Sequence, residues 1–172
     1  MKVNKQEKRD LYFGYYFSPL GPIEIVFSDE ALYGLTFVNR LKDMALFSHP
    51  FLFEVQRQLM EYFSGQRKKF ELPLIYEGTQ FQLAVWSTLL GIPYGETVTY
   101  KDVALSLGRS RGFRAIGAAN RANPISIIIP CHRVIGTDGC LVGYGGGIWR
   151  KRWLLAHEKK HLTFLSQIKK PV

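Results

Sequence analysis

The chain changes its pattern of turns and apolar residues near residue 77. Before that point, short runs rich in aromatic and branched residues alternate with turn-forming clusters, at 11–17, 23–27 and 32–38. Such runs are typical of strands joined by tight turns, so residues 11–38 predict a small antiparallel sheet. A helix is expected at 50–64, because apolar residues recur there at helical spacing and Gly65 ends the run. The segment 66–76 fits either a strand or a linker.

Beyond residue 77 the signals are those of helix starts. Thr79 and Gln82 have the spacing of a capping box, and the apolar stripe behind them predicts a helix that ends at Gly91. Thr99 and Asp102 have the same spacing and begin a second helix. We therefore predict an α+β fold, in which a small N-terminal antiparallel sheet with one helix precedes a mainly helical C-terminal domain.

Two of the expected helices, at 99–107 and 111–121, are joined at a glycine and have the outline of a helix-turn-helix, which many helical hairpins share. Ser110 can cap the later helix. Small residues leave one of its sides nearly bare, namely Gly117, Ala118 and Ala119. Tight packing in the core explains the alanines equally well, but it does not explain three arginines on one short helix, Arg111, Arg114 and Arg121. Arginine suits phosphates and base edges, so this helix is a candidate for contact with DNA.

The charge balance favours the same kind of partner. Lys and Arg total 23 against 14 Asp and Glu, a formal net charge of +9. A basic protein without such a partner can also carry this charge, but the charge favours a polyanionic partner. Two cysteines are too few for a disulfide scaffold, and residues 1–10 lack the apolar core of a signal peptide. No run of about 18 apolar residues is present. We therefore expect a cytoplasmic, intracellular protein with no membrane span.

Cys131 is the candidate reactive residue. The apolar run 125–129 predicts a buried strand that leads into Pro130 and Cys131. A cysteine in such a place is usually an inert, small apolar residue. Pro130, however, fixes the chain as it leaves the expected strand, so that the Cys131 side chain would be held in one position.

The neighbours of Cys131 strengthen the case for chemistry. His132 and Arg133 bring positive charge, from which we expect a lowered pKa of the thiol and a larger thiolate fraction. Glu158 lies far along the chain and could orient the histidine in a cysteine–histidine–acid relay. Because consecutive residues of an extended chain point to opposite faces, we expect a water to carry the proton from Cys131 to His132.

Metal binding is the competing use of these side chains. Cys131, His132, Cys140 and His157 match no common zinc spacing, and adjacent residues are strained as ligands of one ion. The first half of the chain has no cysteine. We therefore predict no metal.

Taken together, the motifs of the second half resemble those of the O6-alkylguanine-DNA alkyltransferases, also called methylated-DNA–protein-cysteine methyltransferases. The run from Ile129 to Val134, Ile-Pro-Cys-His-Arg-Val, resembles the active-site signature of this family. Other blocks follow in the family's order: Ile92-Pro93-Tyr94-Gly95-Glu96-Thr97, Thr99-Tyr100, Arg114-Ala115-Ile116-Gly117, Asn123-Pro124, Gly143-Tyr144 and Leu154-Leu155-Ala156-His157-Glu158. The resemblance is strong over 78–159 and looser over 11–77.

The resemblance implies an organisation and an activity. It implies a ribonuclease H-like N-terminal domain at 1–77, a DNA-binding and alkyl-acceptor domain at 78–159, and a basic tail at 160–172. The activity would be DNA repair by irreversible, single-turnover transfer of an alkyl group from O6-alkylguanine to Cys131 after nucleotide flipping. O4-alkylthymine stays open as a second substrate. The expected partner is double-stranded DNA, bound by a monomer through the minor groove without a cofactor.

The resemblance also implies roles for single residues. Cys131 would accept the alkyl group, His132 would take the thiol proton through a water, and Glu158 would steady His132. Asn123 would hold the turn, and Tyr100 would donate a hydrogen bond to the departing guanine. Arg114 would fill the place of the extruded nucleotide. The other expected DNA contacts are Ser110, Arg111, Gly117, Asn120 and Arg121. The expected base pocket consists of Val134, Tyr144, Gly145 and Gly146.

Some positions depart from the family pattern. Phe113 is bulky for a helix that faces a groove and could pack inward or wedge against DNA, while Asn120 stands where some members have an apolar residue. Gly145 stands where some members have serine. Two other classes remain to be distinguished from a transferase: a lesion-binding module, whose known forms lack the acceptor cysteine, and a cysteine hydrolase, which would need an oxyanion site.

Overall fold

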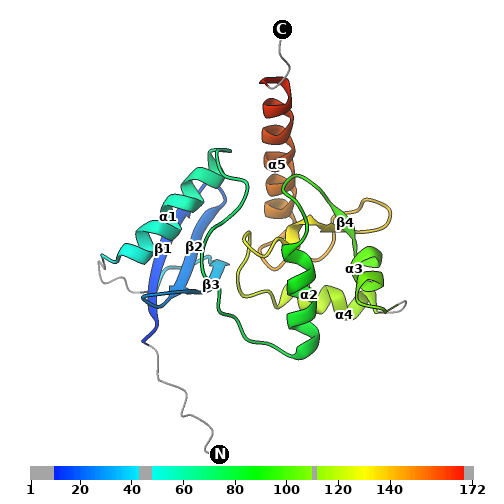
Figure 1. The fold of residues 1–172 in the computed structure, drawn as a ribbon, viewed down its shortest axis with the longest axis horizontal. Coiled ribbons are helices and arrows are strands. Elements are labelled where there is room, and N and C mark those ends of the chain that lie inside the picture. Colours follow the sequence, from blue (N-terminus) through cyan, green and yellow to red (C-terminus); the bar gives the residue numbers. More distant parts are fainter. Residues whose placement is uncertain (1–9, 43–47, 110–111, 169–172) are drawn as a thin grey trace, which may run out of the picture.

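The computed structural model describes residues 10–42, 48–109 and 112–168, with side chains as far as residue 162. A small sheet with one helix lies beside a mainly helical half, and the long last helix projects away from both (Figure 1). The α+β class predicted from the sequence is confirmed. Within the described ranges, no helix has both the length and the apolar character needed to cross a membrane.

The N-terminal half has the predicted antiparallel meander. Its strands lie in sequence order in the sheet and are β1 (Tyr12–Ser18), β2 (Gly21–Phe27) and β3 (Leu32–Phe37). In β2 the side chains of Ile23, Ile25 and Phe27 alternate along the strand and are buried, as expected when one face of a sheet packs on a core. Helix α1 (Pro50–Phe63) packs against β1 and β2.

Helix α1 forms where its apolar spacing predicts. It buries side chains three or four positions apart, Leu52, Val55, Leu59 and Tyr62. The side chain of His49 caps its first turn by accepting a hydrogen bond from the backbone N–H of Phe51, at 3.1 Å. Gly65 follows the helix with a φ of 80°, a conformation that favours glycine, so the predicted stop is confirmed.

The C-terminal half is built from helices. These are α2 (Gln80–Leu90), α3 (Tyr100–Ser106), α4 (Phe113–Arg121) and α5 (Ile148–Ile168). Both predicted capping boxes are present, with reciprocal hydrogen bonds between Thr79 and Gln82 and between Thr99 and Asp102. Helices α3 and α4 pack against each other, and α2 packs on α4, so the predicted helix-turn-helix arrangement is present.

Helix α4 begins later than predicted. The expected start at Arg111 and the expected cap, Ser110, lie outside the described residues, and the helix itself starts at Phe113 after Gly112. Two short parallel strands, β4 (Val98–Thr99) and β5 (Val134–Ile135), pair with each other. Since β4 runs directly into α3, this pairing places the start of α3 beside the segment that follows Cys131.

The strand predicted at 125–129 is wrong. The chain turns sharply there: the N–H of Ile128 donates to the carbonyl of Ser126 at 2.9 Å, and the N–H of Ile129 to that of Ile125 at 3.0 Å. Ile127 has a φ of 73°, which is costly for a branched side chain, by about 1–3 kcal/mol. Its side chain is 1% exposed, so burial offsets that cost. An apolar run shows burial but does not distinguish a strand from a buried turn.

The segment 160–172, predicted as a basic tail, is helical as far as Ile168, so the last helix extends into it. Helix α5 continues to that residue, and the remaining four residues lie outside the described part of the chain. The sequence contains neither glycine nor proline between Ile148 and Ile168, so nothing local ends the helix. Its first three turns are anchored by buried side chains, including Lys151, Leu154 and Glu158.

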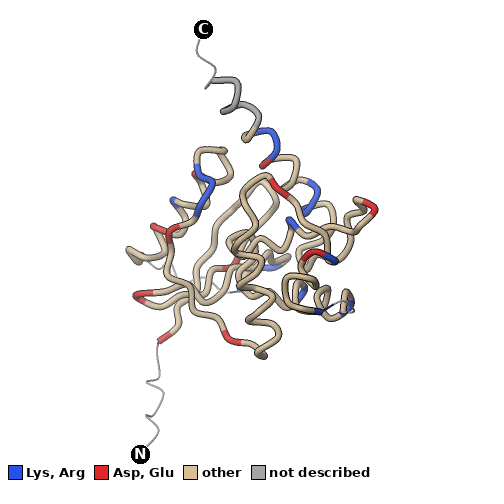
Figure 2. The backbone as a smooth tube through the Cα atoms, turned by 45° about the vertical axis from the view of Figure 1, so that its right-hand side comes forward, with Lys and Arg blue, Asp and Glu red and all other residues tan. Residues whose placement is uncertain are grey.

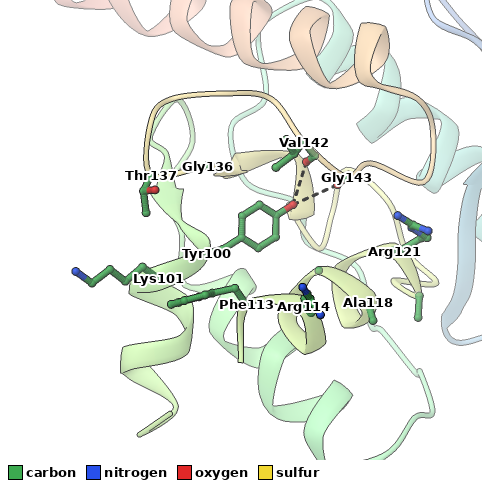
Figure 3. Close-up of a pocket in the computed structure, with 12 residues that line it drawn as sticks. Tyr100, Lys101, Phe113, Arg114, Ala118, Arg121, Gly136, Thr137, Val142 and Gly143 are labelled. Atoms are coloured by element: carbon green, nitrogen blue, oxygen red, sulfur yellow. Dashed lines mark hydrogen bonds between the residues drawn. The ribbon is translucent and has the colours of Figure 1, made fainter. Parts of the chain in front are cut away.

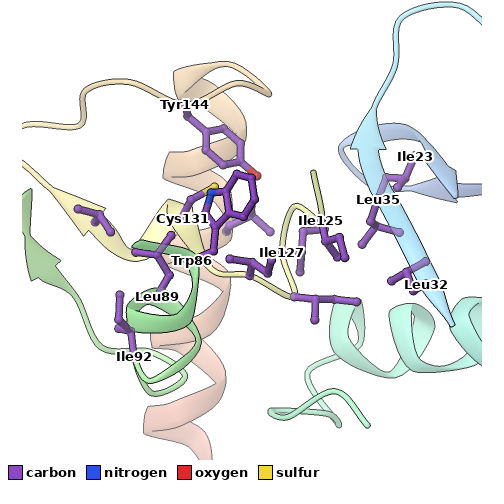
Figure 4. Packing of buried hydrophobic residues seen from close by; sticks show 14 of the residues in the cluster. Ile23, Leu32, Leu35, Trp86, Leu89, Ile92, Ile125, Ile127, Cys131 and Tyr144 are labelled. Carbon is purple, nitrogen blue, oxygen red and sulfur yellow. The ribbon is translucent and has the colours of Figure 1, made fainter. Parts of the chain in front are cut away.

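The two halves share one buried apolar cluster. Figure 4 shows Ile23, Leu32 and Leu35 of the sheet facing the turn at 125–129, with α2 on the other side of that turn. The labelled core residues of the helical half are Trp86, Leu89, Ile92, Cys131 and Tyr144. The domain boundary near residue 77 stays a prediction.

The outer edge of β3 is covered by segments from elsewhere in the chain. The N–H of Leu35 donates to the carbonyl of Pro124 at 2.9 Å, and the N–H of Ser126 donates back to Leu35 at 2.8 Å. Leu32 forms a similar bridge to Leu74, so the segment 66–76 is a linker with one strand-like contact. The turn that precedes Cys131 is therefore hydrogen-bonded to the sheet.

Core packing on α2 can be tested with two neighbouring leucines. Leu89 is fully buried, whereas Leu90 is 42% exposed. We expect Leu89→Ala to lower the free energy of unfolding by about 2–5 kcal/mol, because it leaves a cavity, and Leu90→Ala to lower it by less than about 1 kcal/mol. Urea denaturation of both variants measures the free energy of unfolding. Equal decreases for the two variants would contradict the burial of Leu89 in the core.

Candidate active site

Cys131 begins a short 3₁₀ turn, Cys131–Arg133, and its side chain is 4% exposed. Asn123 holds this region. Its Nδ2 donates to Sγ of Cys131 at 3.2 Å and to the carbonyl of Ile129 at 2.8 Å, while its Oδ1 accepts from the N–H of Ile125 at 3.0 Å. Asn123 therefore ties the sulfur to both ends of the preceding turn.

His132 and Glu158 are brought together as the sequence suggested. Nε2 of His132 lies 2.9 Å from Oε1 of Glu158, and both side chains are fully buried. Arg133 donates to the same carboxylate from Nε and Nη2, each at 2.9 Å. Tyr62 donates its hydroxyl to Oε1 at 2.7 Å, and the N–H of Gly95 donates to Oε2 at 3.0 Å. Among the described residues, Glu158 thus accepts five hydrogen bonds.

These contacts decide the charges of the pair. Burial raises the pKa of the Glu158 carboxyl, but hydrogen bonds from His132 and Arg133, together with the positive charge of Arg133, outweigh it and hold that pKa well below its ordinary value. Burial also lowers the pKa of His132, more than Glu158 raises it. At neutral pH the site therefore holds an ionised Glu158 and a neutral His132.

The second ring nitrogen of His132 is available for proton transfer. If Nε2 donates to Glu158, Nδ1 is an acceptor, and it is buried without a hydrogen-bond partner in the described part of the protein. Buried polar atoms of this kind are commonly satisfied by water. The relay from Cys131 through a water stays a prediction.

The expected lowering of the thiol pKa is wrong. The side chains of His132 and Arg133 turn to Glu158, as described, so they do not supply positive charge to the sulfur. Burial raises the pKa of the Cys131 thiol, and the hydrogen bond from Asn123 and the charge of Lys151 offset this only in part. In the free protein at neutral pH, Cys131 is a protonated thiol held in place.

Lys151 is a residue of the site that sequence reasoning missed. It is fully buried, and its Nζ donates to the carbonyls of Val134 at 2.6 Å and Val142 at 2.8 Å. Burial lowers the pKa of Lys151 to about 8. Lysine on a basic helix ordinarily faces solvent, and no local pattern marks this one as buried. Only the folded chain brings Lys151 to the segments that contain Val134 and Val142.

Tyr100 approaches the same loop from α3. Its hydroxyl donates to the carbonyl of Val142 at 3.0 Å and lies 3.3 Å from that of Gly143 (Figure 3). Burial raises the pKa of Tyr100, so the hydroxyl keeps its proton at neutral pH. Tyr100 therefore lies beside the site with its proton in place, and its hydrogen bond to the departing guanine stays a prediction.

A cavity of about 170 Å³ opens beside Cys131. Of the expected base pocket, Tyr144, Gly145 and Gly146 line it, while Val134 is not among its walls. Its other lining residues are Thr36, Phe37, Asn120, Arg121, Asn123 and Ser126. Two of these, Thr36 and Phe37, belong to β3 or its end and were not predicted, because only the folded chain brings the sheet to the cysteine.

A larger hollow of about 840 Å³ lies along the outer side of α4 (Figure 3). Its walls include three residues expected to contact DNA: Arg114, Gly117 and Arg121. Phe113 also lines it and is 47% exposed, so this side chain faces the hollow and does not pack inward. Arg121 lines both spaces, so the hollow and the Cys131 cavity are neighbours.

One expected contact, Asn120, does not lie on this surface. Asn120 is 2% exposed and lines the cavity at Cys131, so its side chain is placed inside the protein and not on the outer face of α4. Ser110 and Arg111 lie outside the described residues.

Lys and Arg of the described chain occur on α1, α3, α4 and α5 (Figure 2). Across the described positions, no three potential His, Cys, Asp or Glu ligands gather as a metal site.

Two family descriptions together match nearly the whole chain. The ribonuclease-like domain of 6-O-methylguanine DNA methyltransferase matches residues 11–76, and the DNA binding domain of the same protein matches residues 80–160. The chain belongs to the 6-O-methylguanine DNA methyltransferase family. This confirms the resemblance found in the motifs around Cys131.

Curated relatives support membership of the methyltransferase family over most of the chain. A methylated-DNA–protein-cysteine methyltransferase of Methanosarcina barkeri is 46% identical over 157 residues, which cover 88% of this chain and 99% of that protein. A protein of the same name from Mycobacterium leprae is 43% identical over 154 residues, covering 87% and 93%.

Solved structures of the family have the same fold. The crystal structure of Mycobacterium tuberculosis O6-methylguanine methyltransferase matches with a TM-score of 0.80 and 39% identity, covering 91% of this chain and 99% of that one. A structure of M. tuberculosis OGT in complex with DNA matches with a TM-score of 0.79 and 42% identity, covering 87% and 93%.

The buried carboxylate predicts a pH dependence of stability. Because the pKa of Glu158 is lowered on folding from an ordinary 4.5, its contribution is complete above about pH 4.5 and is lost as the pH falls through the folded pKa. At pH 7 we expect Glu158→Gln to cost about 3–5 kcal/mol, because Arg133 is left buried without a counter-charge.

Urea denaturation of both proteins between pH 7 and pH 3 measures this dependence, and the difference between native protein and variant should shrink as the pH falls. Glu96→Gln is the matched control, since Glu96 is exposed, and should change stability little at any pH. A difference that stays constant down to pH 3 would contradict the assigned charge of Glu158.

Proposed function

We propose that this protein repairs DNA by transferring an alkyl group from O6 of an alkylated guanine to the sulfur of Cys131. The observation that carries the proposal is a cysteine that Asn123 holds beside a cavity. The next residue along the chain, His132, is oriented by its hydrogen bond to Glu158. Family membership and the names of the relatives support the reaction, and the DNA-bound M. tuberculosis structure supports DNA as the partner. One copy of the chain supplies every group of the site, which supports action as a monomer.

The damaged nucleotide has to leave the helix before the reaction. An O6-alkyl carbon inside a duplex is out of reach of a cysteine buried to this degree, so the nucleotide must be flipped, at a cost of a few kcal/mol. The side chain of Arg114 lies on the outer side of α4 and would enter the stack in its place. Small residues such as Gly117 and Ala118 let α4 approach the narrow minor groove, where the bulky Phe113 can act as a wedge.

The transfer is a displacement at carbon. As the thiol proton passes through a water to His132, the sulfur electron pair attacks the alkyl carbon and forms a C–S bond. The C–O bond breaks, and its electron pair stays with guanine. Tyr100 donates a hydrogen bond to the base, so the leaving guanine need not carry a full negative charge. Glu158 stabilises the imidazolium that forms on His132.

The product explains why one molecule would repair one lesion. The thioether on Cys131 is not cleaved by acid–base chemistry at neutral pH, so no group of the site can restore the thiol. Because the thiol pKa is raised in the free protein, little thiolate is present to react with other electrophiles before a base arrives.

Label transfer tests the reaction directly. With duplex DNA that contains radiolabelled O6-methylguanine, we expect about one label per native protein molecule and none on Cys131→Ser, because only a sulfur here can accept the methyl group. Cys140→Ser is the control and should still accept label, since Cys140 is exposed and lies in a different loop. Release of a small labelled product with turnover would indicate a hydrolase, and tight binding without label would indicate a binding module.

Flipping can be tested separately from chemistry. We expect Arg114→Ala to slow repair of duplex DNA by roughly tenfold to a hundredfold, because the gap in the stack is no longer filled. Reaction with free O6-benzylguanine, which needs no flipping, should change little. Arg152→Ala removes the same charge from an exposed position on α5 that lines neither cavity and serves as the control. Equal losses on the two substrates would argue against this role of Arg114.

A further inference from the structure

The side chain of Asn120 is buried without a hydrogen bond. It lies on α4, is 2% exposed, and neither its Oδ1 nor its Nδ2 has a hydrogen-bond partner among the residues that the structure describes. Buried amides in folded proteins are nearly always hydrogen-bonded, because an unsatisfied donor or acceptor costs stability. The exception at Asn120 therefore calls for an explanation.

Its position supplies one. Asn120 lines the cavity beside Cys131, together with Tyr144, whose buried hydroxyl likewise lacks a hydrogen bond within the described structure. The amide of Asn120 also lies close enough to Tyr100, the tyrosine expected to donate to the base, to offset part of the rise that burial gives its pKa, but the two side chains do not meet in hydrogen-bond geometry. Two polar side chains without hydrogen-bond partners, Asn120 and Tyr144, thus line the space beside the sulfur.

We propose that Asn120 is a specificity-determining residue that hydrogen-bonds the extruded base. This inference rests on the proposed function. An amide presents a donor beside an acceptor, so it fits a base edge on which an acceptor lies beside a donor. O6-alkylguanine has such an edge, because alkylation leaves ring nitrogen N1 without a proton next to the 2-amino group. Nδ2 of Asn120 donates to N1, and Oδ1 accepts from the amino group.

The same arrangement discriminates between bases. A base that lacks the amino group leaves Oδ1 buried without a donor, and sites built on hydrogen bonds reject such analogues. An apolar side chain at position 120 provides no such penalty. Asn120 therefore selects for the base that carries the alkyl group, in addition to the alkyl group itself.

A purely structural role makes the opposite prediction for stability. Leucine has the same number of non-hydrogen side-chain atoms as asparagine, in the same branched arrangement, and none of them is polar. Asn120→Leu therefore removes two unsatisfied groups, and the adjoining cavity has room for the larger methyl groups. If the amide serves a ligand, the variant should unfold at the same or a higher temperature than the native protein. If the amide serves the fold, the variant should unfold at a lower temperature.

The experiment compares two duplexes, one with O6-methylguanine and one with O6-methylhypoxanthine, which has hydrogen in place of the 2-amino group. Single-turnover methyl transfer to native protein should be roughly tenfold faster from O6-methylguanine, as expected for one buried hydrogen bond. Asn120→Leu should slow transfer from O6-methylguanine by about that factor and transfer from O6-methylhypoxanthine much less, so that the ratio of the two rates approaches one.

Ile116→Val is the matched control, because Ile116 is fully buried on α4 one turn earlier, and it should leave the ratio unchanged. An unchanged ratio in Asn120→Leu, with or without a lower unfolding temperature, would overturn the inference and leave the proposed function intact. A native protein that takes methyl groups from neither duplex would overturn both.

Discussion

The structure depends most on the buried carboxylate of Glu158. A charge without solvent is tolerated only when other groups compensate it, and here the compensation comes from three parts of the chain: Tyr62 on α1, Gly95 after α2, and His132 and Arg133 on the 3₁₀ turn Cys131–Arg133. Helix α5, which carries Glu158, is thereby fixed relative to both halves. The group that orients the histidine is also the group that joins the N-terminal helix to the site.

Around this anchor the acceptor is held in a fixed but unreactive state. Asn123 and the strained turn at Ile127 fix the position of Cys131, while burial keeps its thiol protonated. His132 is neutral and has one ring nitrogen available. Reaction then requires the alkylated nucleobase in the cavity, because that base brings both the electrophilic carbon and hydrogen-bonding partners for the polar side chains there. This combination suits a protein that can react only once.

The features that the sequence predicted correctly are those set by local signals. The meander, helix α1 and both capping boxes follow from spacing and turn residues a few positions apart. The His132–Glu158 contact followed from their chemistry and from the family resemblance. Features set by burial were missed: the turn at 125–129, the environment of Lys151 and the raised pKa of the Cys131 thiol. Each depends on which distant segments exclude water from a residue, and no local pattern records that.

The pairing of Leu35 with Pro124 and Ser126 has a consequence for the protein after repair. The segment that shapes the acceptor turn is also the cover of an otherwise open strand edge. An alkyl group left on the sulfur takes up room in the cavity beside Cys131, and any shift of the turn that accommodates a larger group loosens that cover. An uncovered strand edge offers backbone hydrogen bonds to another chain. The acceptor site and the protection of the sheet edge therefore involve the same few residues.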